Sequence, residues 1–203
     1  KWILASTPVF AFIMILSSIR SNIDVLILNG MLGEHDVGLY SAANKLVNIF
    51  KLGISCYIMA IQPVIFRVFL SSFKKFKEIS TESIRYIFVL FIPLIIITTI
   101  LRDKFIRLIF GESFLPSGDV LFILIWMLLF YGLNQIYANM LVSSNNQKIN
   151  LWANIIGMIA NVTLNLLLIP HLKYLGAALS SVVSAIFTLA YQHYYVSKNL
   201  FKV

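Results

Sequence analysis

Charged residues are scarce in this sequence of 203 residues. They make up 12% of the chain, about half the share of an average soluble domain, whereas 60% of the residues are hydrophobic. The mean hydropathy is correspondingly high, at +0.89. This composition excludes an ordinary soluble domain, and we therefore expect an all-α integral membrane protein that crosses the bilayer several times.

Groups that support enzyme chemistry are also few. The single cysteine, Cys56, cannot form an internal disulfide. The three histidines, His35, His171 and His193, fall in loops or at the end of an apolar run and gather no cluster typical of a metal site. The sequence contains no G-x-S-x-G motif, no P-loop and no paired carboxylates inside an apolar run. We therefore expect neither an enzyme nor a bound cofactor or metal.

Acidic residues are outnumbered, with 8 Asp and Glu against 16 Lys and Arg. Most of the basic residues lie between apolar runs, where membrane topology explains them better than nucleic-acid binding does. One side would hold Lys1, the cluster at 67–85, Lys148, Lys198 and Lys202, and the other side Arg102, Lys104, Arg107 and Lys173. This bias predicts that both ends of the chain are cytoplasmic, and it predicts no nucleic-acid partner.

Six apolar runs are present, at about 2–29, 37–66, 84–101, 120–143, 149–169 and 175–196. They predict a single bundle of about six transmembrane helices that occupies residues 1–203. A basic connector at 67–85 predicts a short amphipathic segment at the membrane surface. The chain opens on Lys1 and Trp2, without Met and without a signal-peptide pattern, so we expect a fragment of a longer protein.

A polar line runs along the second predicted span. On a helix its members fall within roughly 60° of one another and extend over about 27 Å, close to the depth of a hydrocarbon core. A lysine at mid-membrane costs roughly 2.5–3.5 kcal/mol, so it should face protein or water rather than lipid. We favour a cavity lining over a polar seam buried against another helix. The line consists of Asn44, Asn48, Lys51, Ser55 and Gln62.

Arg20 and Asp24 lie four residues apart in the first predicted span, so their side chains can meet on one helix face. Asp24 is the only carboxylate inside a predicted span. Buried ionic groups in membranes pair with one another and mark ion or substrate paths. Asp24 is therefore our candidate for ion coupling, and the alternative is a structural ion pair that joins two helices.

Three further polar faces occur in the last three predicted spans. In the fifth span we favour close helix packing over a cavity lining, and in the sixth the small residues favour packing, with Gln192 near the cytoplasmic end. For the fourth span both roles stay open. The faces comprise Asn150, Asn154, Gly157, Asn161 and Asn165; Ala177, Ser181, Ser184, Thr188 and Gln192; and Tyr131, Gln135 and Asn139, with Asn134 nearby.

Four motifs occur along residues 38–184: GLYSAANKL (38–46), RLIFGESFLPS (107–117), NVTLNLLLIP (161–170) and GAALSSVVS (176–184). Their order and spacing, more than any single motif, carry a resemblance that covers nearly the whole chain. Together they resemble the C-terminal half of the polysaccharide (O-antigen type) flippases, within the multidrug/oligosaccharidyl-lipid/polysaccharide exporter superfamily. One departure is Lys173, where these proteins often have glycine.

The resemblance implies one half of a pseudo-symmetric two-bundle transporter in the bacterial inner membrane. Such a transporter moves polyprenyl-pyrophosphate-linked oligosaccharides between leaflets by alternating access during cell-surface polysaccharide (O-antigen, lipopolysaccharide) biosynthesis. Its partners would be that substrate, the bilayer and the N-terminal half. Lys51 and Arg20 would hold the pyrophosphate, with Asp24 limiting how tightly Arg20 binds it.

The remaining candidates for substrate binding are polar side chains able to meet sugar hydroxyls. Two rival functions stay open, an ion-coupled multidrug antiporter of the same superfamily and a membrane scaffold that transports nothing. The candidates are Asn44, Asn48, Ser55, Gln62, Gln135, Asn139 and Asn154.

Overall fold

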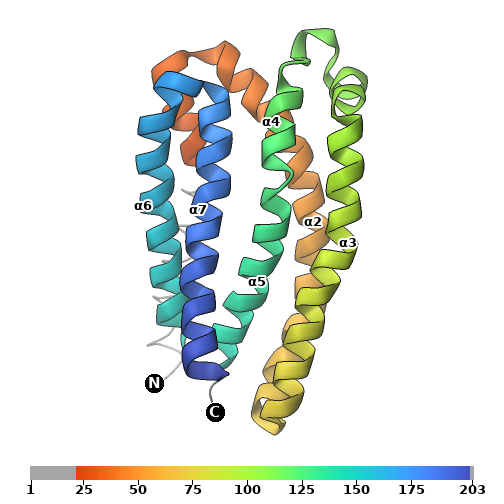
Figure 1. Ribbon diagram of the computed structural model, residues 1–203, viewed down its shortest axis with the longest axis vertical. Coiled ribbons are helices and arrows are strands. Elements are labelled where there is room, and N and C mark those ends of the chain that lie inside the picture. The colour runs from red at the N-terminus through yellow and green to blue at the C-terminus, as the bar shows by residue number, and fades with distance from the viewer. Residues whose placement is uncertain (1–21, 202–203) are drawn as a thin grey trace.

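A computed structural model describes residues 22–201 of the chain, and every regular element in that range is helical. The all-α prediction is confirmed. Figure 1 shows the elements as a bundle of long helices. They are a helical segment at Asn22–Leu32, α2 (Glu34–Ser71), α3 (Phe73–Phe110), the 3₁₀ turn η1 (Glu112–Phe114), α4 (Ser117–Leu124), α5 (Met127–Ser143), α6 (Gln147–Leu172), α7 (Tyr174–Tyr195) and the π-helical turn η2 (Val196–Leu200).

Helices α2 and α3 form a hairpin with a single-residue turn. Ser72 is extended at this turn, and its side-chain oxygen accepts a hydrogen bond from the backbone N–H of Lys75, which caps the start of α3. Each helix has 38 residues and is thus about 57 Å long, nearly twice the thickness of a hydrocarbon core. The basic connector expected as a separate surface segment is instead divided between the end of α2 and the start of α3.

The fourth predicted span is two helices rather than one. Helix α4 ends at Leu124 and α5 begins at Met127. At the junction, the N–H of Leu128 bonds to the carbonyl of Ile125 (3.1 Å), and that of Leu129 to the carbonyl of Trp126 (3.2 Å). These bonds span three residues instead of four, which tightens the backbone locally. The break places the start of α5 beside the polar interior described below.

Helices α6 and α7 form a second hairpin, and its turn requires a close backbone approach. A Cβ added to Gly176 would stand 2.6 Å from the carbonyl oxygen of Leu168 and 2.9 Å from the backbone nitrogen of Ile169. Lys173, where the flippases often have glycine, adopts a positive φ of 51°. A side chain is unfavourable in that backbone region, so this turn stores strain that glycine would not.

Substituting Gly176→Ala is expected to lower the free energy of unfolding by about 1–3 kcal/mol, because α7 must move away from the backbone of α6. The measurement is the unfolding midpoint of the full-length protein in detergent. Gly53→Ala in α2 is the matched control, since a Cβ there meets no atom of the described residues within 4 Å. Alanine at that helical position should stabilise by about 0.5–1 kcal/mol. Shifts of the same sign in both variants would contradict the packing argument.

Helices α6 and α7 bury mainly small and polar residues and expose large apolar ones. Along α6 the buried face carries three asparagines and a glycine, and along α7 it carries serine, threonine, glutamine and alanine. This arrangement inverts that of a soluble bundle and is typical of helices packed in lipid. The exposed apolar side chains on these two helices include Trp152, Ile159, Leu166, Leu167, Ile186 and Phe187.

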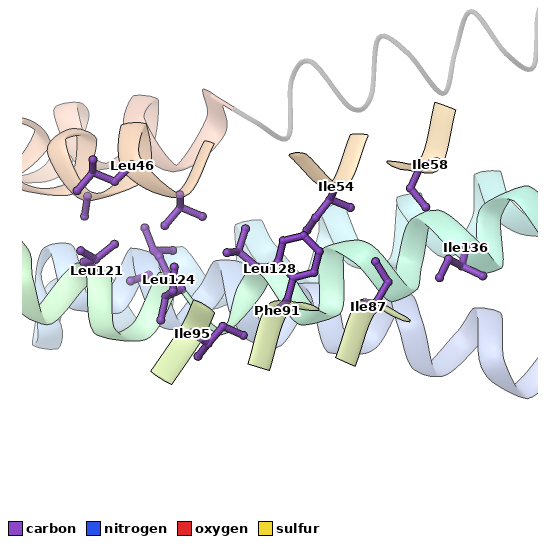
Figure 2. Packing of buried hydrophobic residues seen from close by; sticks show 14 of the residues in the cluster. Leu46, Ile54, Ile58, Ile87, Phe91, Ile95, Leu121, Leu124, Leu128 and Ile136 are labelled. Atoms are coloured by element: carbon purple, nitrogen blue, oxygen red, sulfur yellow. The ribbon is translucent and has the colours of Figure 1, made fainter. Parts of the chain in front are cut away.

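The apolar core is concentrated on α2, α3, α4 and α5, as Figure 2 shows in close view. Branched aliphatic side chains from these helices interdigitate, and many are fully buried. Residues at this interface include Leu46, Ile54, Ile58, Ile87, Phe91, Ile95, Leu121, Leu124, Leu128 and Ile136. This packing holds the four helices together, while the opposite faces of α2 and α5 turn toward α6 and α7.

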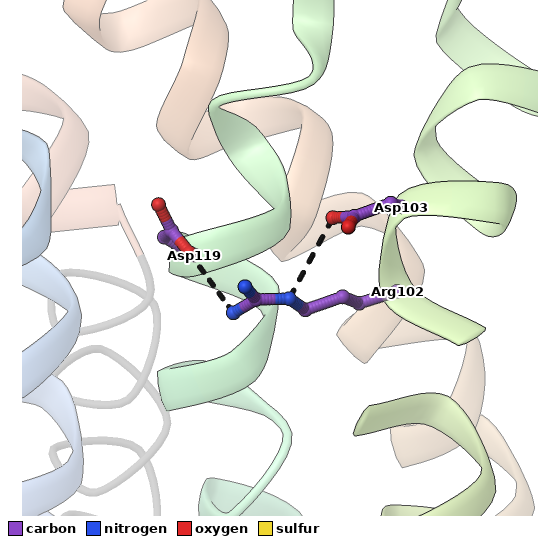
Figure 3. A network of polar contacts seen from close by, with 3 residues as sticks. All are labelled: Arg102, Asp103 and Asp119. Atoms are coloured by element: carbon purple, nitrogen blue, oxygen red, sulfur yellow. Dashed lines mark ion pairs between the residues drawn. The ribbon is translucent and has the colours of Figure 1, made fainter. Parts of the chain in front are cut away.

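Arg102 links the end of α3 to the start of α4 (Figure 3). Its Nη1 lies 2.9 Å from Asp119 Oδ1, and its Nε lies 3.6 Å from Asp103 Oδ1. Both carboxylates are largely exposed, so the pairs add little stability. Their effect is to orient the connection that carries the chain into α4.

Within residues 22–201, five helical stretches are long and apolar enough to cross a membrane. They are Glu34–Ser71, Phe73–Phe110, Ser117–Ser143, Gln147–Leu172 and Tyr174–Leu200. The first predicted span lies mostly outside the described residues.

Candidate functional site

A cavity of about 240 Å³ lies between α2, α5, α6, α7 and the helical segment Asn22–Leu32. Most of the residues that line it have polar side chains, although membrane-type helices surround it. Its lining comprises Asp24, Tyr40, Asn44, Asn48, Lys51, Met127, Tyr131, Asn134, Gln135, Ala138, Asn150, Asn154, Asn161, Ser181, Ser184, Ala185, Thr188 and Gln192.

The lining residues cover the same length on three helices. They extend over twelve residues, or eleven steps of the helix, on α2 (40–51), on α6 (150–161) and on α7 (181–192). At about 1.5 Å per residue, each stretch is about 17 Å long, roughly half the thickness of a hydrocarbon core. The cavity therefore occupies a substantial part of the membrane depth, with Asp24 toward one end and Gln192 toward the other.

Among the described residues, four uncharged donors from three other helices bind Asp24. Tyr40 Oη donates to its Oδ2 at 2.8 Å, and Ser181 Oγ donates to the same oxygen. The Nδ2 atoms of Asn161 and Asn165 donate to its Oδ1 at 2.9 Å and 2.6 Å. Asp24 is 5% exposed. Four hydrogen bonds to a buried carboxylate stabilise its negative charge and join the first helical segment to α2, α6 and α7.

Amide side chains form a second network toward the other end. Gln192 Nε2 donates to Asn150 Oδ1 at 2.9 Å, which bridges α7 and α6. Asn154 Nδ2 donates to the same oxygen at 3.2 Å and to the backbone carbonyl of Asn150 at 2.8 Å. One turn of α6 thus presents its amides both to α7 and to the cavity.

Lys51 is the basic residue of the described cavity wall. Its Nζ lies 5.8 Å from the centre of the Tyr131 ring, within the range of a cation–π contact. The hydroxyl of Tyr131 lies 3.2 Å from Ser55 Oγ. Tyr131 of α5 therefore connects two members of the polar line on α2.

The structure brings six of the sequence-predicted site residues to the cavity wall. These are Asp24, Asn44, Asn48, Lys51, Gln135 and Asn154. Ser55 does not border the described cavity, but it contacts two residues of its wall through hydrogen bonds, to Tyr131 Oη and to the backbone carbonyl of Lys51. Gln62 is exposed and Asn139 is buried, and neither borders the described cavity. Arg20 lies outside the described residues, so its predicted pairing with Asp24 stays a prediction.

Sequence reasoning missed how the other polar faces meet Asp24. The face on α6, for which we favoured packing, also lines the cavity through Asn150, Asn154 and Asn161. Tyr40 was not considered, although it falls one helical turn before Asn44 in the polar line of α2. That spacing was the available signal.

Comparison with known proteins gives a family and two relatives. The family model described as MatE matches residues 10–167. The capsular polysaccharide biosynthesis protein CapF of Staphylococcus aureus is 25% identical over 206 residues, a match that covers 99% of this chain and 51% of CapF. The probable low-salt glycan biosynthesis flippase Agl15 of Haloferax volcanii is 25% identical over 173 residues, which covers 84% of this chain and 37% of Agl15.

The chain spans about half the length of CapF and less of Agl15. The resemblance to polysaccharide flippases that the sequence motifs carry is confirmed by these matches. The family match extends over well more than half of the residues. The chain therefore belongs to the MatE family, whose members are multi-pass membrane transporters and not enzymes, as its sequence predicted.

Proposed function

We propose that this chain is one bundle of a transporter that moves a polyprenyl-pyrophosphate-linked oligosaccharide across a membrane in polysaccharide biosynthesis. The names of the two relatives support a role in glycan export. Because the chain spans only part of their length, the second, pseudo-symmetric bundle would come from the rest of the protein, and this chain would be the C-terminal half.

The observation that carries the proposal is a cavity whose described wall holds amides, hydroxyls, the carboxylate of Asp24 and the ammonium of Lys51, inside a bundle whose outer surface is apolar. Buried polar groups without a partner are costly in a membrane, so a polar cavity of this extent favours water or a polar ligand as its occupant over a lipid chain. Alternating access would then arise when the two bundles rock about this mid-membrane site. A scaffold would require packed seams but no such cavity.

In this proposal each part of the wall meets a different part of the substrate. Lys51 is the main contact for the pyrophosphate, with Arg20 as the second. The sugar hydroxyls are bound by Asn44, Asn48, Gln135 and Asn154. Ser55 contributes to this binding indirectly, through its hydrogen bond to Tyr131. The substrate-binding roles of Gln62 and Asn139 stay predictions.

We assign ion coupling to Asp24. Its four hydrogen bonds join helices on all sides of the cavity's end, so a proton or a metal cation on this carboxylate would change contacts on several helices at once. The distribution of Lys and Arg supports a topology with both ends of the chain cytoplasmic. The likeness to the bacterial protein CapF supports a location in the bacterial inner (plasma) membrane.

An ion-coupled multidrug antiporter is the second candidate. The observation in its favour is the same Asp24, because a carboxylate in a cavity attracts organic cations. Lys51 in the same wall opposes that reading, since it repels a cationic drug.

Reconstitution of the full-length protein in vesicles tests the two functions. A fluorescent polyprenyl-pyrophosphate-linked oligosaccharide is expected to change leaflets faster in these vesicles than in protein-free ones, and an imposed ion gradient should increase the rate. A cationic dye should not be transported. Transport of the dye alone would support the antiporter, and transport of neither probe would contradict both functions.

A further inference from the structure

The first turns of α3 lie outside the hydrocarbon core. Helix α3 begins at Phe73, whereas its apolar run begins at about residue 84, so about 16 Å of helix precedes the apolar part. The headgroup region on each side of a bilayer is only about 5–7 Å thick. Figure 1 shows the turn between α2 and α3 extending past the end of α7. The hairpin therefore passes through the headgroup region and reaches the water beyond it.

One flank of this part of α3 is basic. On a helix, Lys74, Lys77 and Arg85 fall within about 80° of one another, on the side away from the buried Phe76. All three are exposed, and they extend over about 17 Å along the helix axis. We call these three residues the basic flank. It presents its charges at the height of the headgroups and just above them.

The acids of the hairpin do not neutralise the basic flank. Glu82 Oε1 lies 3.9 Å from Arg85 Nη1, and both side chains are more than half exposed, so this ion pair is weak. Within residues 22–201, no salt bridge joins Lys74 or Lys77 to a carboxylate. Residues 67–85 hold five basic side chains against two acidic ones, which gives a net charge of +3.

The basic flank is carried by a packed hairpin. The rings of Phe69 and Phe76 have centroids 5.1 Å apart, and those of Phe73 and Phe76 are 5.8 Å apart, so aromatic contacts hold the two helices together at the turn. Lys77 Nζ lies 5.1 Å from the centre of the Phe201 ring, which joins the flank to the C-terminal end of the described chain. A ligand of the flank therefore has little backbone to order.

The opposite end of α3 shows what a neutralised end looks like. Arg102 Nη1 lies 2.9 Å from Asp119 Oδ1, and Arg107 Nε lies 3.1 Å from Glu112 Oε1. Residues 102–119 hold three basic and three acidic side chains, a net charge of zero. The two ends of one helix thus differ in charge, and only the end at the α2–α3 turn carries an excess of positive charge.

We propose that the basic flank binds the headgroups of anionic phospholipids in the leaflet on the side of the α2–α3 turn. Arg85 lies at the edge of the apolar run and reaches the headgroup phosphates from the hydrocarbon side, while Lys77, about two turns away, reaches them from the water side. Each basic side chain near an anionic surface strengthens binding about fivefold.

An acidic protein segment would also match the charge of the flank. The position of Arg85 favours lipid, because a side chain at the edge of the hydrocarbon is in contact with headgroups and is poorly placed to meet a protein in the water. The lipid site is also separate from the cavity, so it depends on neither the substrate nor the coupling ion proposed above.

Native mass spectrometry of the detergent-solubilised full-length protein tests the site with phosphatidylglycerol and phosphatidylcholine that share their acyl chains. The wild type should bind phosphatidylglycerol at least about tenfold more tightly. Ammonium acetate that shortens the Debye length from about 10 to about 3 Å should reduce this preference. The variant Lys74→Gln/Lys77→Gln/Arg85→Gln should keep less than about a twofold preference, with unchanged affinity for phosphatidylcholine, which reports that it is folded. Lys74→Arg/Lys77→Arg/Arg85→Lys should bind as the wild type does.

Arg102→Gln/Lys104→Gln/Arg107→Gln is the matched control, because it removes the same charge from the other end of α3. It should keep the tenfold preference. The proposal is overturned by a glutamine variant of the basic flank that keeps the preference, or by a control that loses it equally, since binding would then follow net charge alone. A wild type without preference, at any salt concentration, would also overturn it and would make an acidic protein the better candidate for the flank. None of these results bears on transport through the cavity.

Discussion

Replacing Asp24 by leucine is expected to lower the free energy of unfolding by about 3–5 kcal/mol, because the change leaves four buried donors without their acceptor. Single side-chain hydrogen bonds in membranes average only about 0.6 kcal/mol. Here all four converge on one charged group, and bonds to charged groups are worth about 1.5–3 kcal/mol each. The loss should appear as a lower unfolding midpoint of the full-length protein and as lower expression.

Asp24→Asn separates the structural role from the charge. The amide oxygen still accepts from Asn161 and Asn165, and its Nδ2 can donate to the hydroxyls of Tyr40 and Ser181, since a hydroxyl accepts as well as donates. We expect a loss of only about 1 kcal/mol. Transport by this variant should no longer respond to an ion gradient.

Asp103→Asn, at an exposed position, is the control and should change neither stability nor gradient dependence. Two results would count against our assignment of Asp24. One is an Asp24→Leu protein as stable as the wild type, and the other is gradient-driven transport by Asp24→Asn.

Most of the fold follows from composition and hydropathy, because a chain this apolar can satisfy its backbone in lipid only as helices or a closed barrel. The helix ends did not follow. A hydropathy run marks the part of a helix that lies in hydrocarbon, whereas α3 begins eleven residues before its predicted span and α2 continues five residues beyond its own. The break between Leu124 and Met127 has no sequence signal, since neither Pro nor Gly occurs there.

The site was predictable where one helix sufficed to define it. The helical period places Asn44, Asn48 and Lys51 on one face of α2, and all three line the cavity. The same projection also includes Gln62, which lies about 16 Å beyond Lys51 along the helix axis. A helical projection gives the angle of a side chain around the axis but not its position along the axis. It also cannot say which residues of other helices meet that face.

The surroundings of Asp24 required the tertiary structure. Its partners on α6 and α7 are 137 to 157 residues away in the sequence, and spacing rules reach only the neighbours on one helix. Two polar faces that a single sequence assigns to packing can therefore meet around one carboxylate. Small residues on α6 and α7 let the helices approach, and their polar members then form the wall of the cavity.

Substituting Lys51→Met is expected to reduce transport of a polyprenyl-pyrophosphate-linked oligosaccharide by about 10- to 150-fold. Hydrogen bonds from a charged group to an anion are worth about 1.5–3 kcal/mol, and a pyrophosphate that enters the membrane without this partner also loses the compensation for its desolvation. Methionine keeps the length and the apolar stem of the side chain. The fold should persist, because the residue lines a cavity and is not enclosed in the apolar core.

Lys45→Met is the matched control, since Lys45 lies on the same helix, is exposed and stands apart from the described cavity wall. It should transport at the wild-type rate. Lys51→Arg keeps the positive charge but replaces a compact ammonium by a larger, planar guanidinium. We therefore expect Lys51→Arg to transport faster than Lys51→Met but more slowly than the wild type. A Lys51→Met protein that transports as fast as Lys45→Met would show that the positive charge in the cavity does not bind the pyrophosphate. The anion would then have to be held by Arg20 or by the other bundle, and Lys51 would have no part in binding it.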